Sequence, residues 1–295
     1  MSTEDQKASV AGVAIARPSV APRWRRRLLR AVFALACGYA LVCGLLYLIQ
    51  DRLIFPAVRF TADPPRRATN LEGVALTRDD GVVLRGLFRK PVQPRAVRRP
   101  TIIYFGGNAE EVTWWGTYAG WPADCNVVLV NYRGYGASSG KPSEAALYAD
   151  AVALHDWVRV RADVDDERIV VFGRSLGSAV ATYVARERPV RAVMLTAPID
   201  RLADVARGVY PWVPVEWLLR HRFDSIARVP ELRQPVLMLA TPLDRVIPIE
   251  HSERLLTAWG GTDRTFVKIP DTDHSDIASD GRYWDAIRTF MIRVR

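Results

Sequence analysis

Cysteine is scarce in this chain of 295 residues, and the three that occur are Cys37, Cys43 and Cys125. Two of them lie inside a long apolar run, so no disulfide framework can form in the rest of the chain. Histidine is also rare, with four residues, and no group of His and Cys has the spacing of a zinc or redox site. The sequence therefore predicts chemistry that uses no metal and no other cofactor.

Lysine is nearly absent, since 37 of the 41 basic residues are arginine, a bias typical of a GC-rich, bacterial coding sequence. The formal net charge is +9, and +5 of it falls within the first thirty positions. The remaining chain is only mildly basic and lacks the clustered basic residues with interleaved aromatics that a nucleic-acid-binding face needs. We therefore expect no nucleic-acid partner.

Charged side chains are absent from residues 31–49, which follow an arginine cluster at 23–30. The run is long enough to cross about 30 Å of hydrocarbon, and the arginines favour a cytoplasmic N-terminus. We predict a disordered basic tail over 1–30, a transmembrane helix over 31–50, a linker over 51–72, and a folded domain over 73–295 in the periplasm or otherwise outside the cytoplasm. A cleaved signal peptide is the alternative, but the run's only Ala-x-Ala lies inside it.

Apolar, β-branched runs alternate with helical stretches over residues 73–295. Strands are predicted as an edge hairpin at 74–77 and 82–89, and then at 101–105, 127–130, 169–172, 190–196, 236–240 and 265–269. Helices are predicted after Ser143, a candidate N-cap, and at 178–185, 251–259 and 283–294. This order predicts an α/β fold in which a mostly parallel sheet is covered by helices on both faces.

The sequence Gly173-Arg-Ser-Leu-Gly177 stands between a predicted strand and the helix that follows it. A serine on so sharp a turn needs glycine two residues before and after it, because a Cβ at either position would clash with the flanking backbone. The helix N-terminus behind Ser175 offers N–H groups, that of Leu176 among them, to a developing oxyanion. Ser175 is therefore the predicted nucleophile.

A serine nucleophile needs a base, and the base needs an acid, at the carboxyl ends of the same sheet. His274 follows the last predicted strand in a loop, whereas the other histidines lie in helices or in a polar insertion: His155, His221 and His251. Asp244 follows the strand at 236–240 and is the predicted acid, with Asp200 as the fallback. The chain order Ser175, Asp244, His274 is the order of an α/β-hydrolase triad.

The chain resembles the α/β-hydrolase superfamily and, within it, the membrane-associated Bem46-like serine hydrolases, relatives of the α/β-hydrolase-domain lysophospholipases and protein depalmitoylases. The resemblance rests on these motifs: Gln50-Asp-Arg-Leu-Ile-Phe-Pro56, Gly107-Asn108-Ala109, Asn131-Tyr-Arg-Gly-Tyr-Gly-Ala-Ser138, Gly173-Arg-Ser-Leu-Gly177, Tyr210-Pro-Trp-Val-Pro214, Asp244 and His274. It implies an oxyanion hole formed by the N–H groups of Leu176 and Asn108. The chain departs from the family at Gly106, where a histidine is usual, and at Ala240-Thr241, where the family usually has His-Gly.

An aromatic and apolar insertion at residues 199–229 interrupts the predicted sheet and forms a small cap. Tyr210, Trp212 and Trp217 are candidate substrate-binding residues that either roof an acyl pocket or touch the bilayer, unless they only pack a short cap helix. We expect a membrane-anchored serine hydrolase that cleaves the ester or thioester bond of a small acyl or lipid-like substrate. A serine peptidase on the same fold and a catalytically silent, membrane-tethered binding module are the alternatives.

Overall fold

A computed structural model describes residues 23–56, 70–92 and 97–294. It divides the chain into two units, of which the first ends at Leu46 and the second begins at Tyr47. Helix α1 (Arg23–Ile54) supplies the described part of the first unit and the beginning of the second. It is long and apolar enough to cross a membrane, although a signal sequence near an N-terminus has the same length and composition.

Helix α1 extends beyond the predicted span of 31–50 at both ends. Residues 23–30 are helical, where the sequence predicts a disordered tail, and the helix continues to Ile54, where it predicts a linker. The extension at the second end has a physical cause, because the side chains of Gln50 and Asp51 are hydrogen-bonded to the cap. The rest of the predicted tail and most of the linker, residues 1–22 and 57–69, lie outside the described residues.

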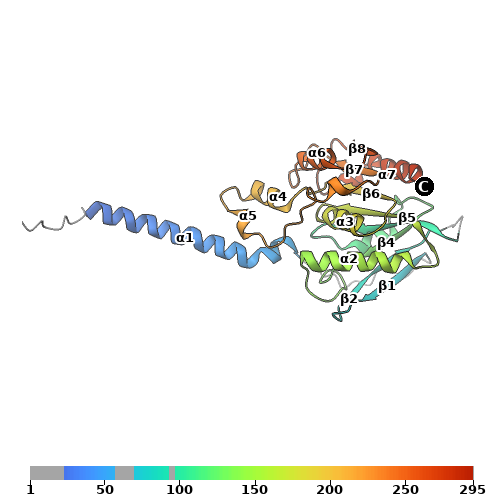
Figure 1. The fold of residues 1–295 in the computed structure, drawn as a ribbon, viewed down its shortest axis with the longest axis horizontal. Coiled ribbons are helices and arrows are strands. Elements are labelled where there is room, and N and C mark those ends of the chain that lie inside the picture. Colours follow the sequence, from blue (N-terminus) through green and yellow to red (C-terminus); the bar gives the residue numbers. More distant parts are fainter. Residues whose placement is uncertain (1–22, 57–69, 93–96, 295) are drawn as a thin grey trace, which may run out of the picture. The chain divides into compact units, whose positions relative to one another are not determined.

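The second unit is built on an eight-stranded sheet with the order β1-β2-β4-β3-β5-β6-β7-β8 (Figure 1). Strands β1 (Leu71–Thr77) and β2 (Val83–Arg89) form an antiparallel hairpin at one edge, and β2 pairs antiparallel with β4 (Asn126–Val130). All other pairs are parallel and involve β3 (Arg99–Phe105), β5 (Val164–Arg174), β6 (Ala192–Thr196), β7 (Val236–Ala240) and β8 (Arg264–Lys268). The predicted edge hairpin and mostly parallel sheet are confirmed.

Helices cover both faces of the sheet, because alternate residues of each central strand point to opposite sides. Ile103 packs in the core under α2 (Glu144–Arg159), α3 (Leu176–Glu187) and α6 (Ile249–Ala258). Tyr104 packs in the opposite core, under α7 (Gly281–Arg293) and the short 3-10 helix η1 (Val112–Thr117). The predicted N-cap Ser143 accepts a hydrogen bond from the N–H of Ala146 at 3.3 Å. The two-sided α/β architecture is therefore confirmed.

The cap lies between β6 and β7 and contains α4 (Leu202–Val209) and α5 (Val215–Leu218), drawn in yellow to orange in Figure 1. Short 3-10 turns η2 (Val229–Glu231) and η3 (Ile277–Ser279) complete the unit. The base of the cap is closed by one residue, since the carbonyl of Asp200 accepts hydrogen bonds from the N–H groups of Ser225 and Ile226 at 2.8 and 2.9 Å.

The strand order reverses at β3. The chain passes from β3 to β4 on one side and later to β5 on the other, so β3 has neighbours from two directions of winding. The loops that leave the carboxyl ends of such strands diverge and open a crevice, which is where open α/β sheets bind their ligands. The loop at Gly106–Asn108 and the turn at Ser175 therefore meet at this edge.

Candidate active site

Ser175 lies between the last residue of β5, Arg174, and the first residue of α3, Leu176. Its backbone has φ 52° and ψ −121°, a conformation that costs a residue other than glycine about 1–3 kcal/mol. Hydrogen bonds hold the turn in place: the N–H of Ser175 donates to the carbonyl of Thr196 at 2.9 Å, and its own carbonyl accepts from the Ser178 hydroxyl at 2.6 Å. Hydrogen bonds to β6 and to the first turn of α3 thus stabilise the strained conformation of Ser175.

The two glycines around Ser175 allow this turn to form. A Cβ at Gly173 would lie 2.2 Å from the carbonyl oxygen of Gly177, and a Cβ at Gly177 would lie 2.1 Å from the carbonyl oxygen of Phe105. Real Cβ atoms do not approach backbone so closely, so larger residues would push the turn away from β3. The steric reason that the sequence predicts for the glycine pair is confirmed.

Asp244 and His274 meet at the same edge of the sheet, in the loops that follow β7 and β8. The Asp244 Oδ2 lies 2.7 Å from His274 Nδ1, and Asp244 Oδ1 accepts the N–H groups of Val246 at 2.9 Å and Ile247 at 2.7 Å. A carboxylate only accepts hydrogen bonds, so Nδ1 of the imidazole carries a proton and Nε2 is left as the basic nitrogen. The Asp244 side chain is 1% exposed and that of His274 is 15% exposed.

The loop after β3 lies directly against Ser175. A Cβ built on Gly107 would lie 3.6 Å from the Cβ of Ser175. The N–H of Gly107 is committed to Glu110 Oε2 at 2.8 Å, whereas the carbonyl of Asn108 accepts the Tyr135 hydroxyl at 2.6 Å. Leu176 is the first residue of α3, and the first N–H groups of a helix have no acceptor within the helix. The N–H groups of Leu176 and Asn108 as the oxyanion donors stay a prediction.

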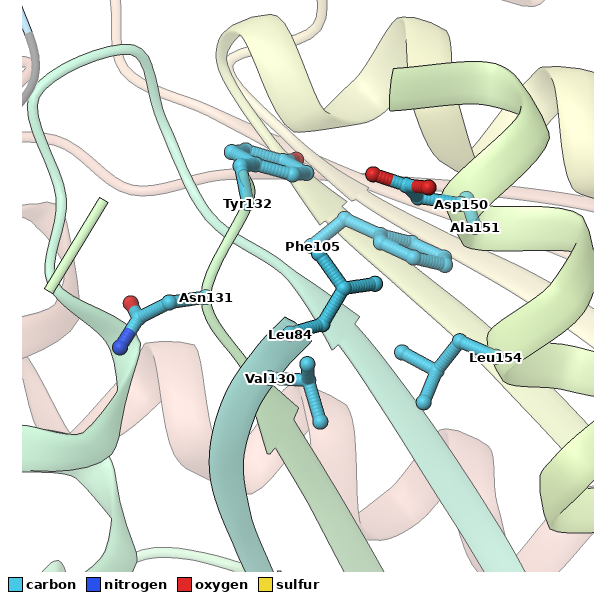
Figure 2. Close-up of a pocket in the computed structure, with 8 residues that line it drawn as sticks. All are labelled: Leu84, Phe105, Val130, Asn131, Tyr132, Asp150, Ala151 and Leu154. Carbon is cyan, nitrogen blue, oxygen red and sulfur yellow. The ribbon is translucent and has the colours of Figure 1, made fainter. Parts of the chain in front are cut away.

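Tyr132 supports this loop from behind, since its hydroxyl donates to the carbonyl of Gly106 at 3.0 Å. Figure 2 shows the small apolar cavity beneath it, where Phe105 of β3 faces Ala151 and Leu154 of α2. The cavity has a volume of about 10 Å³, which is at the lower limit for one water molecule. This cavity is therefore a packing defect behind the loop that follows β3, and it is too small to hold a substrate.

Similar proteins decide which family this geometry represents. The chain is 31% identical over 284 residues, 86% of its own length and 92% of the relative's, to the α/β-hydrolase domain-containing protein WAV2 of Arabidopsis thaliana. The chain belongs to the α/β-hydrolase fold family. The family model, described as the alpha/beta hydrolase fold, matches residues 100–228 of this α/β hydrolase.

Other relatives of this α/β hydrolase extend the comparison. It is 43% identical over 168 residues to an uncharacterized protein of Mycobacterium tuberculosis, a match that covers 56% of this chain and 59% of that protein. Among solved structures, it resembles the acetyl xylan esterase from Paenibacillus sp. R4, with TM-score 0.62 and 18% identity over 80% of this chain and 87% of the other. A Pyrococcus furiosus esterase gives TM-score 0.61 and 17% identity, covering 81% and 97%. These two likenesses concern the fold alone.

A partly buried ion pair in the α/β hydrolase links three parts of the site, and the sequence interpretation missed it. Arg174 Nη1 lies 3.2 Å from Glu110 Oε2, and its Nη2 donates to the carbonyl of His274 at 2.8 Å. Glu110 also accepts the Tyr104 hydroxyl at 2.8 Å and the Trp115 indole N–H at 2.5 Å. The turn at Ser175, the loop after β3 and the loop that carries His274 are therefore connected through Glu110 and Arg174.

The charges of this network are supported by their surroundings. Burial alone would lower the pKa of the Arg174 guanidinium, but Tyr104 and Glu110 raise it, so the side chain stays cationic. Burial next to Glu110 raises the pKa of the Tyr104 phenol well above its usual range, so this hydroxyl remains a donor. The signal in the sequence was weak, because Arg174 is a single charge between a buried strand and Ser175, whereas Glu110 stands beside Glu111 in a polar stretch.

The fallback acid Asp200 is engaged elsewhere. Its Oδ1 lies 2.5 Å from His251 Nδ1 and its Oδ2 accepts Arg254 Nε at 2.7 Å. Burial raises the pKa of Asp200, but the hydrogen bonds from His251 and Arg254 outweigh this and lower it overall. The structure thus brings His274 together with Asp244 and joins Asp200 to a second histidine. His155 is buried on α2, and His221 pairs with Asp51 at the end of α1.

The three predicted substrate-binding residues differ in their exposure. Trp217 is 87% exposed and Trp212 is 52% exposed, whereas Tyr210 is partly buried. A groove of about 480 Å³ opens instead beside Asp244 and His274, between the loops that carry them. Exposed apolar side chains, Leu243 and Val246, line it.

Proposed function

We propose that this α/β hydrolase is a membrane-anchored serine hydrolase that cleaves carboxylic ester or thioester bonds of acyl or lipid-like substrates. His274 Nε2 takes the proton of the Ser175 hydroxyl, and the oxygen attacks the acyl carbon. The N–H groups of Leu176 and Asn108 hold the oxyanion, and the protonated imidazole then gives its proton to the leaving alcohol or thiol. Water, activated by the same imidazole, attacks the acyl-enzyme and releases the acid.

The hydrogen bond between Asp244 and His274 is the observation that carries the proposal. This bond orients the imidazole so that Nε2 is the base. His274 lies at the carboxyl ends of the strands, where the strained Ser175 also lies. Arg174 connects these parts directly, since it precedes Ser175 in the chain and its guanidinium donates to the carbonyl of His274. A chain that used the fold only for binding would have no need for the strain at Ser175.

The membrane anchor is supported by the contacts at the end of α1. Gln50 is 6% exposed and its side chain is hydrogen-bonded to the cap, so the end of the apolar helix belongs to the catalytic unit. The arginines at residues 23–30 favour a cytoplasmic N-terminus and a catalytic domain outside the cytoplasm. A substrate that is itself in the membrane, such as an acylated lipid, would then be close to the site.

The proposal is tested with a series of p-nitrophenyl esters and matched acyl thioesters of increasing chain length, using the full chain in detergent micelles. Wild type should hydrolyse at least part of the series, and Ser175→Ala should lose roughly 10³-fold or more in kcat, because the nucleophile is removed. The chain length of the best substrate separates a short-chain esterase from an enzyme of lipids. A folded wild type that hydrolyses none of these substrates would refute the proposed function.

A further inference from the structure

We propose that the cap face carrying Trp212 and Trp217 lies in the headgroup layer of the bilayer that α1 crosses. The inference rests on the anchoring part of the proposed function and does not depend on the catalytic part. It follows from three observations in the second unit: the hydrogen bonds between the end of α1 and the cap, the position of those contacts along the apolar run, and the exposure of the cap's aromatic side chains.

Gln50 joins the end of α1 to the cap through both atoms of its amide. Its Nε2 donates to the carbonyl of Leu218 at 3.1 Å, and its Oε1 accepts the N–H of Arg220 at 2.8 Å. The residue is 6% exposed, so water does not compete for these bonds. The chain just after α5 is therefore held against the end of α1.

Further contacts surround this amide. Asp51 accepts Arg220 Nη2 at 2.8 Å and lies 3.0 Å from His221 Nε2. The Arg220 guanidinium lies 5.1 Å from the centre of the Tyr47 ring, within reach of a cation–π contact. Phe55 is buried, with its ring centre 5.1 Å from that of His221. The last two turns of α1 and the residues after α5 thus form one packed cluster.

The position of this cluster along the chain sets its depth. Residues 31–49 carry no charge, and Gln50 is the first residue after them. Nineteen helical residues span about 28 Å, which matches a hydrocarbon core of about 30 Å. Gln50 therefore lies at the boundary between hydrocarbon and headgroups, and Leu218 lies there with it. Trp217 is the neighbouring residue, and the headgroup layer is about 5–8 Å thick.

The exposed side chains of the cap suit that layer. Trp217 is 87% exposed, Trp212 is 52% exposed and Val209 is 62% exposed. Val215, which lies in α5 with Trp217, is buried. Exposure of this extent argues against a roof over an acyl pocket, because such side chains would point inward. Tryptophan is enriched at membrane interfaces, where its ring is buried and its N–H remains hydrated. A lipid surface is thus the occupant that fits both the exposure and the neighbouring span.

The test compares two exposed apolar positions: one in the cap, which follows the carboxyl end of β6, and one just before the amino end of β5. Trp217→Cys labels the cap, and Val160→Cys labels an 82% exposed position after α2, just before β5 begins. Both are made in the full chain with Cys37→Ala and Cys43→Ala, since Cys125 is buried. The label is a polarity-sensitive fluorophore, and the protein is placed in phosphatidylcholine–phosphatidylglycerol nanodiscs with lipids spin-labelled near the headgroup.

We expect the label at 217 to emit at shorter wavelength and to be quenched by the spin-labelled lipids, and the label at 160 to show neither effect. Gln50→Ala in the Trp217→Cys chain should reduce the quenching, because the cap loses its two bonds to α1. Equal quenching at both positions, or no quenching at 217 in nanodisc-bound protein, would overturn the proposal. A blue shift without quenching would also overturn it and would indicate burial of the label in the protein's own acyl pocket.

The same nanodiscs separate this inference from the catalytic proposal. A fluorophosphonate that modifies Ser175 in a chain whose label at 217 is not quenched refutes the membrane contact alone. A quenched label in a chain that does not react with the fluorophosphonate refutes the catalytic assignment alone. Protein that does not enter the nanodiscs at all contradicts the anchor and, with it, the membrane contact.

Discussion

Two buried aspartates of this domain, Asp244 and Asp200, each pair with a histidine, and the pairs differ in what else the aspartate contacts. Asp244 and His274 are 2.7 Å apart, and the second oxygen of Asp244 accepts only neutral backbone N–H groups. Asp200 and His251 are 2.5 Å apart, but the second oxygen of Asp200 accepts the Arg254 guanidinium. Both aspartates are buried, with side chains 1% and 2% exposed.

The difference explains why the two pairs are suited to different tasks. No arginine among the described residues pairs with Asp244, so its negative charge remains able to stabilise a positive charge that develops on His274. The charge of Asp200 is balanced by Arg254, whose Nη2 also lies 3.0 Å from His251 Nδ1. We infer that the first pair acts in catalysis and the second holds the base of the cap.

The largest predicted contrast between the pairs is in the turnover of esters. Asp244→Asn should lower kcat by roughly 10³–10⁴-fold, because the amide favours the wrong imidazole tautomer and supplies no charge. Asp200→Asn should leave kcat within about tenfold of wild type but lower the free energy of unfolding by about 1.5–3 kcal/mol, because Arg254 and His251 exchange a buried carboxylate acceptor for a neutral amide. Steady-state kinetics and denaturant unfolding of both variants measure this, and similar losses of kcat in the two would contradict the division of roles.

The sequence predicted one pair and missed the other for a physical reason. Ser175, Asp244 and His274 each follow a predicted strand, and parallel strands bring such positions to one edge whatever the details of packing. Asp200 with His251, Glu110 with Arg174, and Gln50 with Leu218 are pairings across 51, 64 and 168 residues. No periodicity or motif encodes them, because each depends on side-chain geometry after folding.

The fold was predictable to a greater depth than the site. The steric need for Gly173 and Gly177 could be argued from the turn alone, and the alternation of strands and helices gave the layered sheet. The end of α1 at Ile54 could not be located, because a polar sequence after an apolar run reads as a linker. Tertiary contacts, among them those of Gln50 and Asp51, stabilise those last turns.

The next contrast concerns Glu110, which ties the first pair to the serine turn. Glu110→Gln should lower kcat/KM by roughly 10–100-fold, because a loosened Arg174 lets the histidine loop shift relative to Ser175. Glu231→Gln is the matched control, since Glu231 pairs with Arg186 on the surface, with both side chains about half exposed. Kinetics with a soluble ester test this, and an unchanged kcat/KM in Glu110→Gln would show that the network does not position the triad.

A smaller effect is expected at the other attachment of the cap. Asp200 closes the cap at its base and Gln50 holds it after α5, so Gln50→Ala should lower the stability of the domain by about 1–2 kcal/mol through loss of two hydrogen bonds. Leu48→Ala, at a 74% exposed position of the same helix, is the control and should have little effect in detergent. Thermal unfolding of both variants tests this, and equal melting temperatures would mean that the hydrogen bonds of Gln50 to the cap contribute no stability.

The smallest effect distinguishes the second pair by pH. The pKa of Asp200 is lowered on folding, so its ionised form stabilises the domain fully above an unfolded pKa of about 3.9 and this stability is lost as the pH falls through the lower, folded pKa. Wild type should therefore lose stability more steeply than Asp200→Asn below about pH 4. Acid unfolding curves of the two proteins test this, and parallel curves would mean that Asp200 does not contribute through its charge.

The most direct measurement is the rate at which a fluorophosphonate labels Ser175 in wild type, His274→Gln and His251→Gln, with the modified peptide identified by mass spectrometry. Both variants replace a histidine with glutamine, and the two Asp–His distances are similar, at 2.7 Å for His274 and 2.5 Å for His251. We predict labelling of Ser175 in wild type, loss of labelling in His274→Gln and a nearly unchanged rate in His251→Gln. Labelling that survives without His274, or that depends on His251 instead, would contradict the assignment of the catalytic pair.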